Sequence, residues 1–157
     1  MKIIIDTREQ TPFFFMDYPC DTMFSALHTG DYSIAGWEDR VTIERKSGID
    51  LCGCLTSSRE RFERELERMR DFEAACVIVE CPLNKLTKLN RKLNKNSIEQ
   101  SILSFAFRYR VPFFFASGRN HGEWLAFNCL RHFWNKQVQC EKNKIGFVPL
   151  NIDKSRM

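Results

Sequence analysis

The sequence predicts an α/β domain in three layers, with a mixed central β-sheet flanked by helices. Two short apolar runs, Ile3–Ile5 and Ala75–Val79, are typical of strands that are buried on both faces. A helical pattern precedes the second run, and the order strand, helix, strand implies a right-handed parallel crossover. A hairpin between residues 32 and 46 adds antiparallel pairing, so we expect the sheet to be mixed.

The hairpin is predicted from two runs and the break between them. Residues 41–46 begin with alternating β-branched side chains, which indicates a strand. Gly36 and the acidic pair Glu38-Asp39 interrupt the chain before this strand. The preceding run, Tyr32–Ala35, is therefore expected to be the neighbouring strand of the hairpin.

Three amphipathic helices are expected, each opened by a capping box in which Ser or Asn is followed three residues later by Glu or Gln. The first helix should run for about four turns, and a strand at Phe113–Phe115 should separate the second helix from the third. After Gln137 the sequence becomes polar, so we expect a folded domain at 1–136 and a loosely packed tail at 137–157. The three boxes are Ser57–Glu60, Ser97–Gln100 and Asn120–Glu123.

The composition excludes few classes of protein, but the cysteines and the short apolar runs indicate the cellular compartment that we expect. A formal net charge of +4 is too small to indicate nucleic-acid binding by itself. The seven cysteines show no zinc-site spacing and no secretory leader precedes them, which favours a reducing cytoplasm. No apolar run approaches the roughly 20 residues of a membrane span, so we expect no membrane partner.

The hairpin gathers two carboxylates and a lysine. Asp31 precedes its first strand, while Glu44 and Lys46 point to one face of its second strand and Arg45 points to the other. Cleavage of a phosphodiester needs an activated water and neutralisation of phosphoryl charge, and a divalent cation serves both needs. We expect Asp31 and Glu44 to bind Mg²⁺ or Mn²⁺. Lys46 is expected to orient or deprotonate the attacking water, or to pair with the phosphate.

Further charged residues flank this group in the sequence. Asp6, at the end of the first strand, is expected to reach the same metal directly or through water, with Arg8 and Glu9 just beyond it. Asp50 is either a cap of the turn that follows it or a site residue. For Arg61 we expect no more than a surface ion pair on the charged helix.

Residues 83–97 form a basic segment, either a loop or a short helix. The segment carries five positive charges and no acidic residue. Contact with a nucleic-acid backbone explains such a run better than plain surface does. The predicted DNA-binding residues in this segment are Lys85, Lys88, Arg91, Lys92 and Lys95.

Four motifs, in this order, resemble the nuclease domain of the XPF-type structure-specific endonucleases, a branch of the PD-(D/E)XK superfamily with a restriction-endonuclease-like fold. The resemblance extends to about Trp134 and so covers most of the chain. The motifs are Asp6-Thr7-Arg8-Glu9, Gly30-Asp31-Tyr32, Glu44-Arg45-Lys46 followed by Asp50, and the strand that ends at Glu80.

The resemblance implies a Mg²⁺- or Mn²⁺-dependent endodeoxyribonuclease that cuts branched, flapped or junction DNA, with a homodimer or a partner protein as a further partner. Because no tandem helix-hairpin-helix motifs follow residue 137, the chain resembles the compact stand-alone forms of bacteria and their phages. The resemblance gives metal binding to Asp31 and Glu44, catalysis to Lys46, and supporting roles to Asp6, Arg8, Glu9, Arg45, Asp50 and Arg59.

Two other classes of function compete with a DNA endonuclease. One is a non-catalytic DNA-binding module, either a degenerate nuclease or the silent subunit of a pair. Its usual sign is a broken metal triad, whereas Asp31, Glu44 and Lys46 are all present. The other is a hydrolase that acts on RNA or nucleotides, since no motif of the sequence reads the sugar 2′-hydroxyl.

Overall fold

The computed structural model describes residues 1–90 and 93–145. Four strands come first, and helices with two further strands follow them. None of the described helices is long and apolar enough to cross a membrane. In chain order the elements are β1 (Lys2–Asp6), β2 (Asp21–Ser25), β3 (Tyr32–Ile34), β4 (Val41–Lys46), α1 (Gly48–Cys54), α2 (Arg59–Met69), β5 (Ala74–Val79), the 3₁₀ turn η1 (Leu83–Lys85), α3 (Leu86–Leu89), α4 (Lys95–Tyr109), β6 (Phe113–Phe115) and α5 (Arg119–Ile145).

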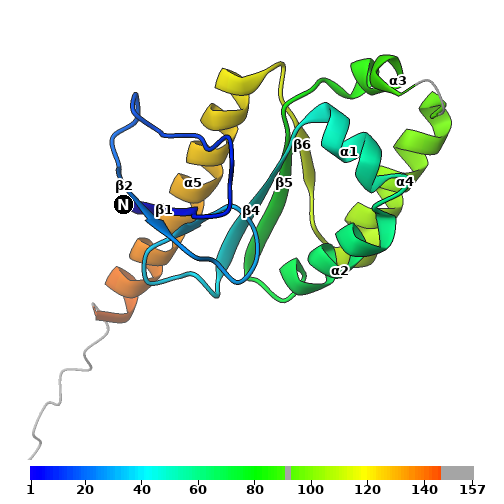
Figure 1. Ribbon diagram of the computed structural model, residues 1–157. Coiled ribbons are helices and arrows are strands. Elements are labelled where there is room, and N and C mark those ends of the chain that lie inside the picture. Colours follow the sequence, from blue (N-terminus) through cyan, green and yellow to red (C-terminus); the bar gives the residue numbers. More distant parts are fainter. Residues whose placement is uncertain (91–92, 146–157) are drawn as a thin grey trace, which may run out of the picture.

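The six described strands form one mixed sheet in the order β2-β1-β3-β4-β5-β6. The pairs β1–β2, β4–β5 and β5–β6 are parallel, while β3 is antiparallel to both of its neighbours. Helices α1 to α4 cover one face and α5 covers the other (Figure 1). The predicted three-layer α/β fold with a mixed sheet is therefore confirmed.

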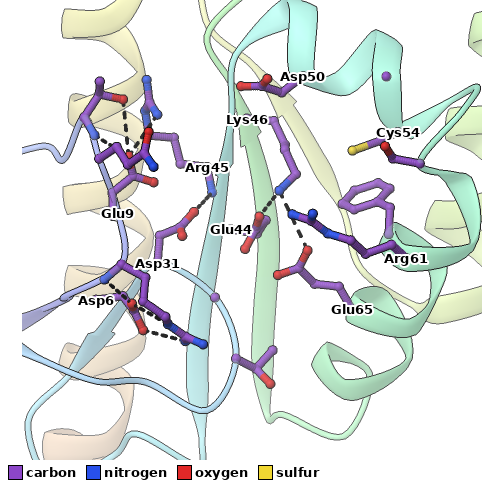
Figure 2. Close-up of a pocket in the computed structure, with 18 of the residues that line it drawn as sticks. Asp6, Glu9, Asp31, Glu44, Arg45, Lys46, Asp50, Cys54, Arg61 and Glu65 are labelled. Carbon is purple, nitrogen blue, oxygen red and sulfur yellow. Dashed lines mark hydrogen bonds and ion pairs between the residues drawn. The ribbon is translucent and has the colours of Figure 1, made fainter.

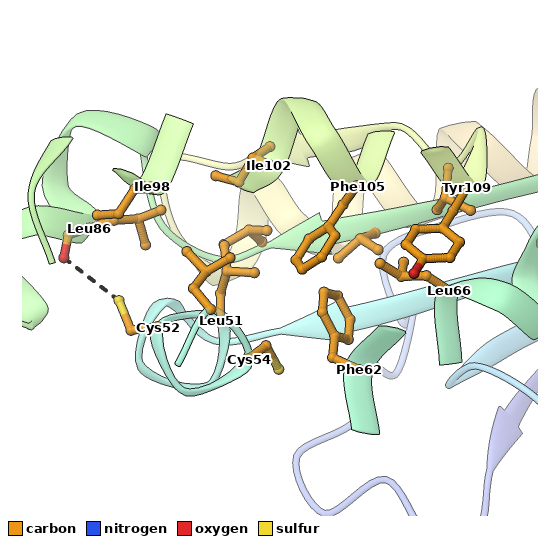
Figure 3. Close-up of a cluster of buried hydrophobic side chains, with 14 of the residues drawn as sticks. Leu51, Cys52, Cys54, Phe62, Leu66, Leu86, Ile98, Ile102, Phe105 and Tyr109 are labelled. Carbon is orange, nitrogen blue, oxygen red and sulfur yellow. Dashed lines mark hydrogen bonds between the residues drawn. The ribbon is translucent and has the colours of Figure 1, made fainter. Parts of the chain in front are cut away.

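A hydrophobic core lies on each face of the sheet, and strand β5 contributes to both because its side chains alternate between the two faces. Val77 and Val79 are fully buried beneath α1 to α4, while Cys76 and Ile78 are buried beneath α5. Figure 3 shows the side chains that the helices contribute to the first core, among them Phe62 and Phe105. In the first core the rings of Phe62 and Phe105 meet edge to face with their centroids 5.8 Å apart, which joins α2 to α4. These cores fix both helical layers to the strands that carry the charged residues.

The predicted strands are present, and two elements appear that the sequence pattern did not predict. The edge strand β2 is mostly exposed on both faces, so it carries no alternating pattern. Helix α1 has only seven residues, fewer than a periodic pattern needs. Its N-cap is Ser47, whose hydroxyl accepts a hydrogen bond from the Asp50 amide at 3.1 Å.

The three predicted capping boxes are wrong in position. Helix α2 begins at Arg59 without a side-chain cap, and α5 begins at Arg119, so Asn120 is already helical. Helix α4 begins after Asn94, whose side chain accepts a hydrogen bond from the Ser97 amide at 2.8 Å. For α4 the side chain of Asn94 thus takes the capping role that was predicted for Ser97.

The last helix is longer than predicted. Helix α5 continues to Ile145, so the first part of the expected 137–157 tail is helical. Gln137 is buried and accepts a hydrogen bond from Arg40 at 2.8 Å, which attaches this helix to the turn before β4. The remaining residues, 146–157, lie outside the described part, and the predicted domain boundary stays a prediction.

Candidate active site

A cleft of about 880 Å³ opens between the sheet at β1, β3 and β4 and helices α1 and α2 (Figure 2). Its lining contains all eight residues that the sequence predicted for catalysis and metal binding. They are Asp6, Arg8, Glu9, Asp31, Glu44, Arg45, Lys46 and Asp50.

The backbone before β3 fixes the position of Asp31. Gly30 has φ +77°, and a Cβ there would lie 2.1 Å from the hydroxyl oxygen of Thr42, so the close approach of the two strands requires glycine. The Asp31 amide donates to the Ile43 carbonyl at 2.8 Å. One carboxylate oxygen of Asp31 accepts a hydrogen bond from the Arg45 amide at 2.7 Å. The Asp31 side chain is thereby held against β4.

The pleat of β4 turns Glu44 and Lys46 into the cleft, on the face covered by α2. Glu44 is 3% exposed and accepts a hydrogen bond from the Lys46 ammonium. The same ammonium lies 3.7 Å from a carboxylate oxygen of Glu65 and 5.4 Å from the centre of the Phe62 ring. Lys46 is thus held between two carboxylates on different elements.

Burial and neighbouring negative charges raise the pKa of the two central carboxyl groups. Burial raises the pKa of Asp31 to about 7, although the hydrogen bond from the Arg45 amide opposes the rise. Burial also raises the pKa of Glu44 well above its usual value, and the negative charge of Asp31 adds to the effect. The charge of Asp31 therefore disfavours the charged form of Glu44, and a cation held by both carboxylates would relieve that repulsion.

The charge of Lys46 follows from its partners. Burial alone lowers the pKa of the Lys46 ammonium, but the carboxylates of Glu44 and Glu65 outweigh burial and raise it. In this arrangement Lys46 is protonated at neutral pH and acts as a hydrogen-bond donor. Deprotonation of a water by Lys46, one of the roles expected from the sequence, requires that these contacts first be broken.

The carboxylate of Asp6 is occupied within the fold. One oxygen accepts from the Arg8 amide at 2.7 Å and from its guanidinium at 2.9 Å. The other accepts from Arg8 at 2.8 Å and from the Leu27 amide at 2.8 Å. Burial by itself raises the pKa of Asp6, but these bonds outweigh burial and lower it. Asp6 anchors the loop after β1, and its metal-binding role stays a prediction.

The donor set of the cleft fits a cation that needs few protein ligands. Among the described residues, no group of three or more His, Cys, Asp or Glu is arranged to hold a metal ion. Asp31 and Glu44 nevertheless both place a carboxyl group in the cleft. Mg²⁺ is typically bound by one or two carboxylates and completes its octahedral shell with waters and substrate phosphate. These two residues therefore match the requirement of Mg²⁺ or Mn²⁺.

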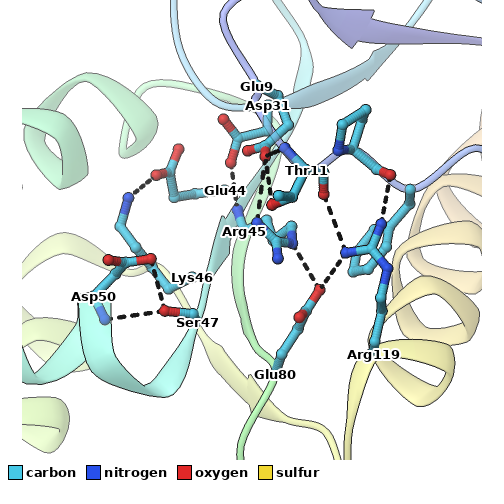
Figure 4. A network of polar contacts seen from close by, with 12 residues as sticks. Glu9, Thr11, Asp31, Glu44, Arg45, Lys46, Ser47, Asp50, Glu80 and Arg119 are labelled. Atoms are coloured by element: carbon cyan, nitrogen blue, oxygen red, sulfur yellow. Dashed lines mark hydrogen bonds and ion pairs between the residues drawn. The ribbon is translucent and has the colours of Figure 1, made fainter.

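Arg45 faces the opposite side of β4, as the strand pleat predicts (Figure 4). Its guanidinium donates to Glu80 at 2.6 Å and lies 3.3 Å from Glu9. Arg119, at the start of α5, approaches Glu80 to 3.5 Å, and both guanidinium groups stack over the Phe13 ring. Arg45 therefore joins the loop after β1 to the ends of β4 and β5, and so holds the wall of the cleft that carries Glu9 in place.

Asp50 combines the two roles that the sequence left open. Its amide is bound by the Ser47 hydroxyl, which also donates to its carboxylate at 2.7 Å. Asp50 therefore lies in the first turn of α1 as part of the cap, and it lines the cleft at the same time.

Of the residues predicted to bind DNA, the four that the structure describes do not line the cleft. Arg59 pairs with Glu63 at 2.9 Å and stacks on Phe105, with 4.5 Å from its guanidinium carbon to the ring centre. The described basic residues lie on η1, on α3 and at the first residue of α4. Their DNA-binding role stays a prediction. They are Lys85, Lys88 and Lys95; Arg91 and Lys92 lie outside the described residues.

Helix α2 adds three charged residues to the cleft that were not predicted as site residues. Arg61, Glu65 and Arg68 all line it. Their spacing of i, i+4 and i+7 places them on one face of the helix. Because α2 is charged at nearly every exposed position, its sequence alone does not show which charged face meets the sheet. Packing of Phe62 and Leu66 decides that orientation.

The family model described as "ERCC4 domain" matches residues 5–127, which is more than half of the chain. No match was found among curated protein sequences.

Two solved structures share the fold. XPF from Aeropyrum pernix is 18% identical with a TM-score of 0.68, over 83% of this chain and 60% of that one. XPF from Aeropyrum pernix in complex with DNA is 17% identical with a TM-score of 0.68, over 86% of this chain and 66% of that one. The chain thus spans somewhat less than two thirds of either XPF chain. By its family match and its architecture, the chain belongs to the ERCC4 domain family and has the fold of an XPF-type nuclease domain.

Proposed function

We propose that the chain is a Mg²⁺- or Mn²⁺-dependent endodeoxyribonuclease that hydrolyses phosphodiester bonds in branched, flapped or junction DNA. The observation that carries this proposal is the placement of Asp31, directly before β3, and Glu44, on β4, in one cleft beside Lys46. Each carboxyl group has a raised pKa, which a divalent cation would lower by stabilising the charged form. Membership of the ERCC4 domain family supports the same activity.

Each of the cleft residues would have a separate role in such a reaction. Asp31 and Glu44 would hold the cation, with Asp31 oriented by the Arg45 amide and Glu44 by Lys46. When bound, the cation supplies charge neutralisation at the phosphoryl oxygens and a lowered pKa for water. With Glu44 holding a cation, the Lys46 ammonium would keep Glu65 as a neighbour and could donate to a phosphate oxygen or to the attacking water. Arg45 keeps the loop that carries Glu9 against the sheet.

The proposed substrate is DNA with a junction between duplex and single strand. A solved XPF structure of the same fold contains DNA, which supports DNA as the ligand class. A homodimer or a protein partner that completes the DNA-binding surface, and a cytoplasmic location in a bacterium or phage-infected cell, stay predictions.

Incubation of the purified chain with matched substrates tests the proposal. Flap, fork, four-way junction, single-stranded and duplex DNA, together with a flap made of RNA, are each incubated with Mg²⁺, with Mn²⁺ and with chelator. We expect strand cleavage of the branched DNA substrates that requires the cation. Cleavage that persists in chelator would contradict the two-carboxylate cation site.

The same incubation separates the competing functions. A non-catalytic DNA-binding module would shift the mobility of branched DNA without cutting it under any of these conditions. A ribonuclease would cut the RNA flap in preference to the DNA flap. Either result would replace the proposed activity.

A further inference from the structure

Helix α2 brings an unpaired arginine to the cleft. Arg61 is exposed and lines the cleft, and it makes no hydrogen bond or ion pair within residues 1–90 and 93–145. Figure 2 shows its side chain extending from α2 toward Lys46 and Glu65. Those neighbours are already engaged, because Lys46 contacts both Glu44 and Glu65. A free guanidinium group thus faces a cleft in which Lys46 is already paired with Glu44 and Glu65.

The cationic groups of the cleft surround its acidic centre. Arg68, two turns after Arg61, has one long hydrogen bond of 3.3 Å to the Thr29 hydroxyl. On the opposite wall Arg8 is held by Asp6, while 68% of its side chain stays exposed. A guanidinium group matches the geometry of a phosphate and binds it through two parallel hydrogen bonds. A nucleic-acid strand entering the cleft would therefore meet arginines on both sides of the carboxylates.

We propose that Arg61 binds a phosphate of the DNA strand and positions that strand across Asp31 and Glu44, with Arg68 at an adjacent phosphate. This inference rests on the proposed function and names the residues by which the same cleft holds its substrate. Arg59, the arginine of α2 that the sequence predicted to bind DNA, already contacts Glu63 and Phe105, whereas Arg61 is unpaired among the residues that the structure describes.

Helix α2 also offers a matched control. Arg64 is exposed, lies one turn after Arg61, and has no partner in the described part of the chain, but it does not line the cleft. Replacing either arginine by alanine removes one charge from the same helix. If Arg61 acted only through the net charge of the protein, the two variants would behave alike.

The test measures binding to a flapped duplex as a function of salt, in full-length chains that also carry Glu44→Gln so that bound DNA stays intact. Arg61→Ala should reduce the slope of log K against log salt by about 0.9, the value for one phosphate contact, and should weaken binding about tenfold or more at moderate salt. Arg64→Ala should leave the slope unchanged. Arg61→Lys should keep the slope, because it keeps the charge, and bind with intermediate affinity.

Equal slopes for Arg61→Ala and Arg64→Ala would overturn the inference, whether both fall or both stay at the parent value. Thermal midpoints of the two variants should agree within about 2 °C, since both side chains are exposed. The two proposals fail separately. If the wild-type chain cuts DNA but the slopes are equal, only the Arg61 contact is wrong. If the slopes differ but the wild-type chain cuts no DNA, only the hydrolytic function is wrong.

Discussion

Replacement of Asp31 by asparagine should stabilise the protein at alkaline pH and have much less effect under acid conditions. Burial raises the pKa of Asp31 from 3.8 to about 7 in the folded chain. Between these two values the folded state holds a proton that the unfolded state releases, so the free energy of unfolding falls as pH rises through this window. Above pH 7 the loss is complete. Asparagine keeps an acceptor for the Arg45 amide but carries no charge at any pH.

The rise from 3.8 to about 7 corresponds to about 4 kcal/mol, at 1.36 kcal/mol for each pKa unit. Urea unfolding in chelator near pH 4 and near pH 8 measures the effect. The stability advantage of Asp31→Asn over wild type should be roughly 2–4 kcal/mol larger at the higher pH. The lower end of this range allows for water, which enters the cleft on its open side and screens the charge of Asp31. Asp71→Asn, at a side chain that is 81% exposed, is the control and should show no such trend. An Asp31→Asn advantage that is equal at the two pH values would refute the role of burial.

Three further changes test other parts of the site. Lys46→Ala should lower the cleavage rate about 100-fold or more. Its cation affinity, measured by calorimetry, should change less than threefold. A loss confined to cation affinity would contradict the role of Lys46 at the substrate. Gly30→Ala should destabilise the chain by about 2 kcal/mol or more, because the added Cβ would lie 2.1 Å from the Thr42 hydroxyl. An unchanged urea midpoint would show that the close approach of the backbone at Gly30 to Thr42 does not require glycine. Arg45→Ala should cost about 3 kcal/mol in unfolding free energy, since it leaves Glu80 with fewer partners, and limited proteolysis should cut the loop after β1 faster.

The elements that the sequence predicted are those whose own residues carry the signal. Strands β1, β4 and β5 are apolar or β-branched because they are buried, and burial leaves a pattern in the sequence. The same holds for Glu44 and Lys46, whose common face follows from the period of a strand. Strand β2 is the opposite case, since its exposed residues are under little pressure to be apolar.

The part of the site on α2 could not be predicted for a related reason. Arg59, Arg61 and Arg64 are equally hydrophilic, so hydrophobic periodicity places all of them on the solvent side. Their environments differ through contacts made by other elements: Phe105 of α4 attracts Arg59, while the open cleft beside β4 leaves Arg61 unpaired. Such distinctions depend on tertiary packing, which the local pattern does not contain.

Calorimetric titration of Mn²⁺ into the wild-type chain, Glu44→Gln and Asp31→Asn tests most directly whether two carboxylates of the hairpin form a cation site. Glu38→Gln, at an exposed position in the turn before β4, is the matched control. The two-carboxylate site predicts saturable binding in the wild-type and control chains, and a loss of about tenfold or more in affinity for each cleft variant. Equal affinities in all four chains would contradict it.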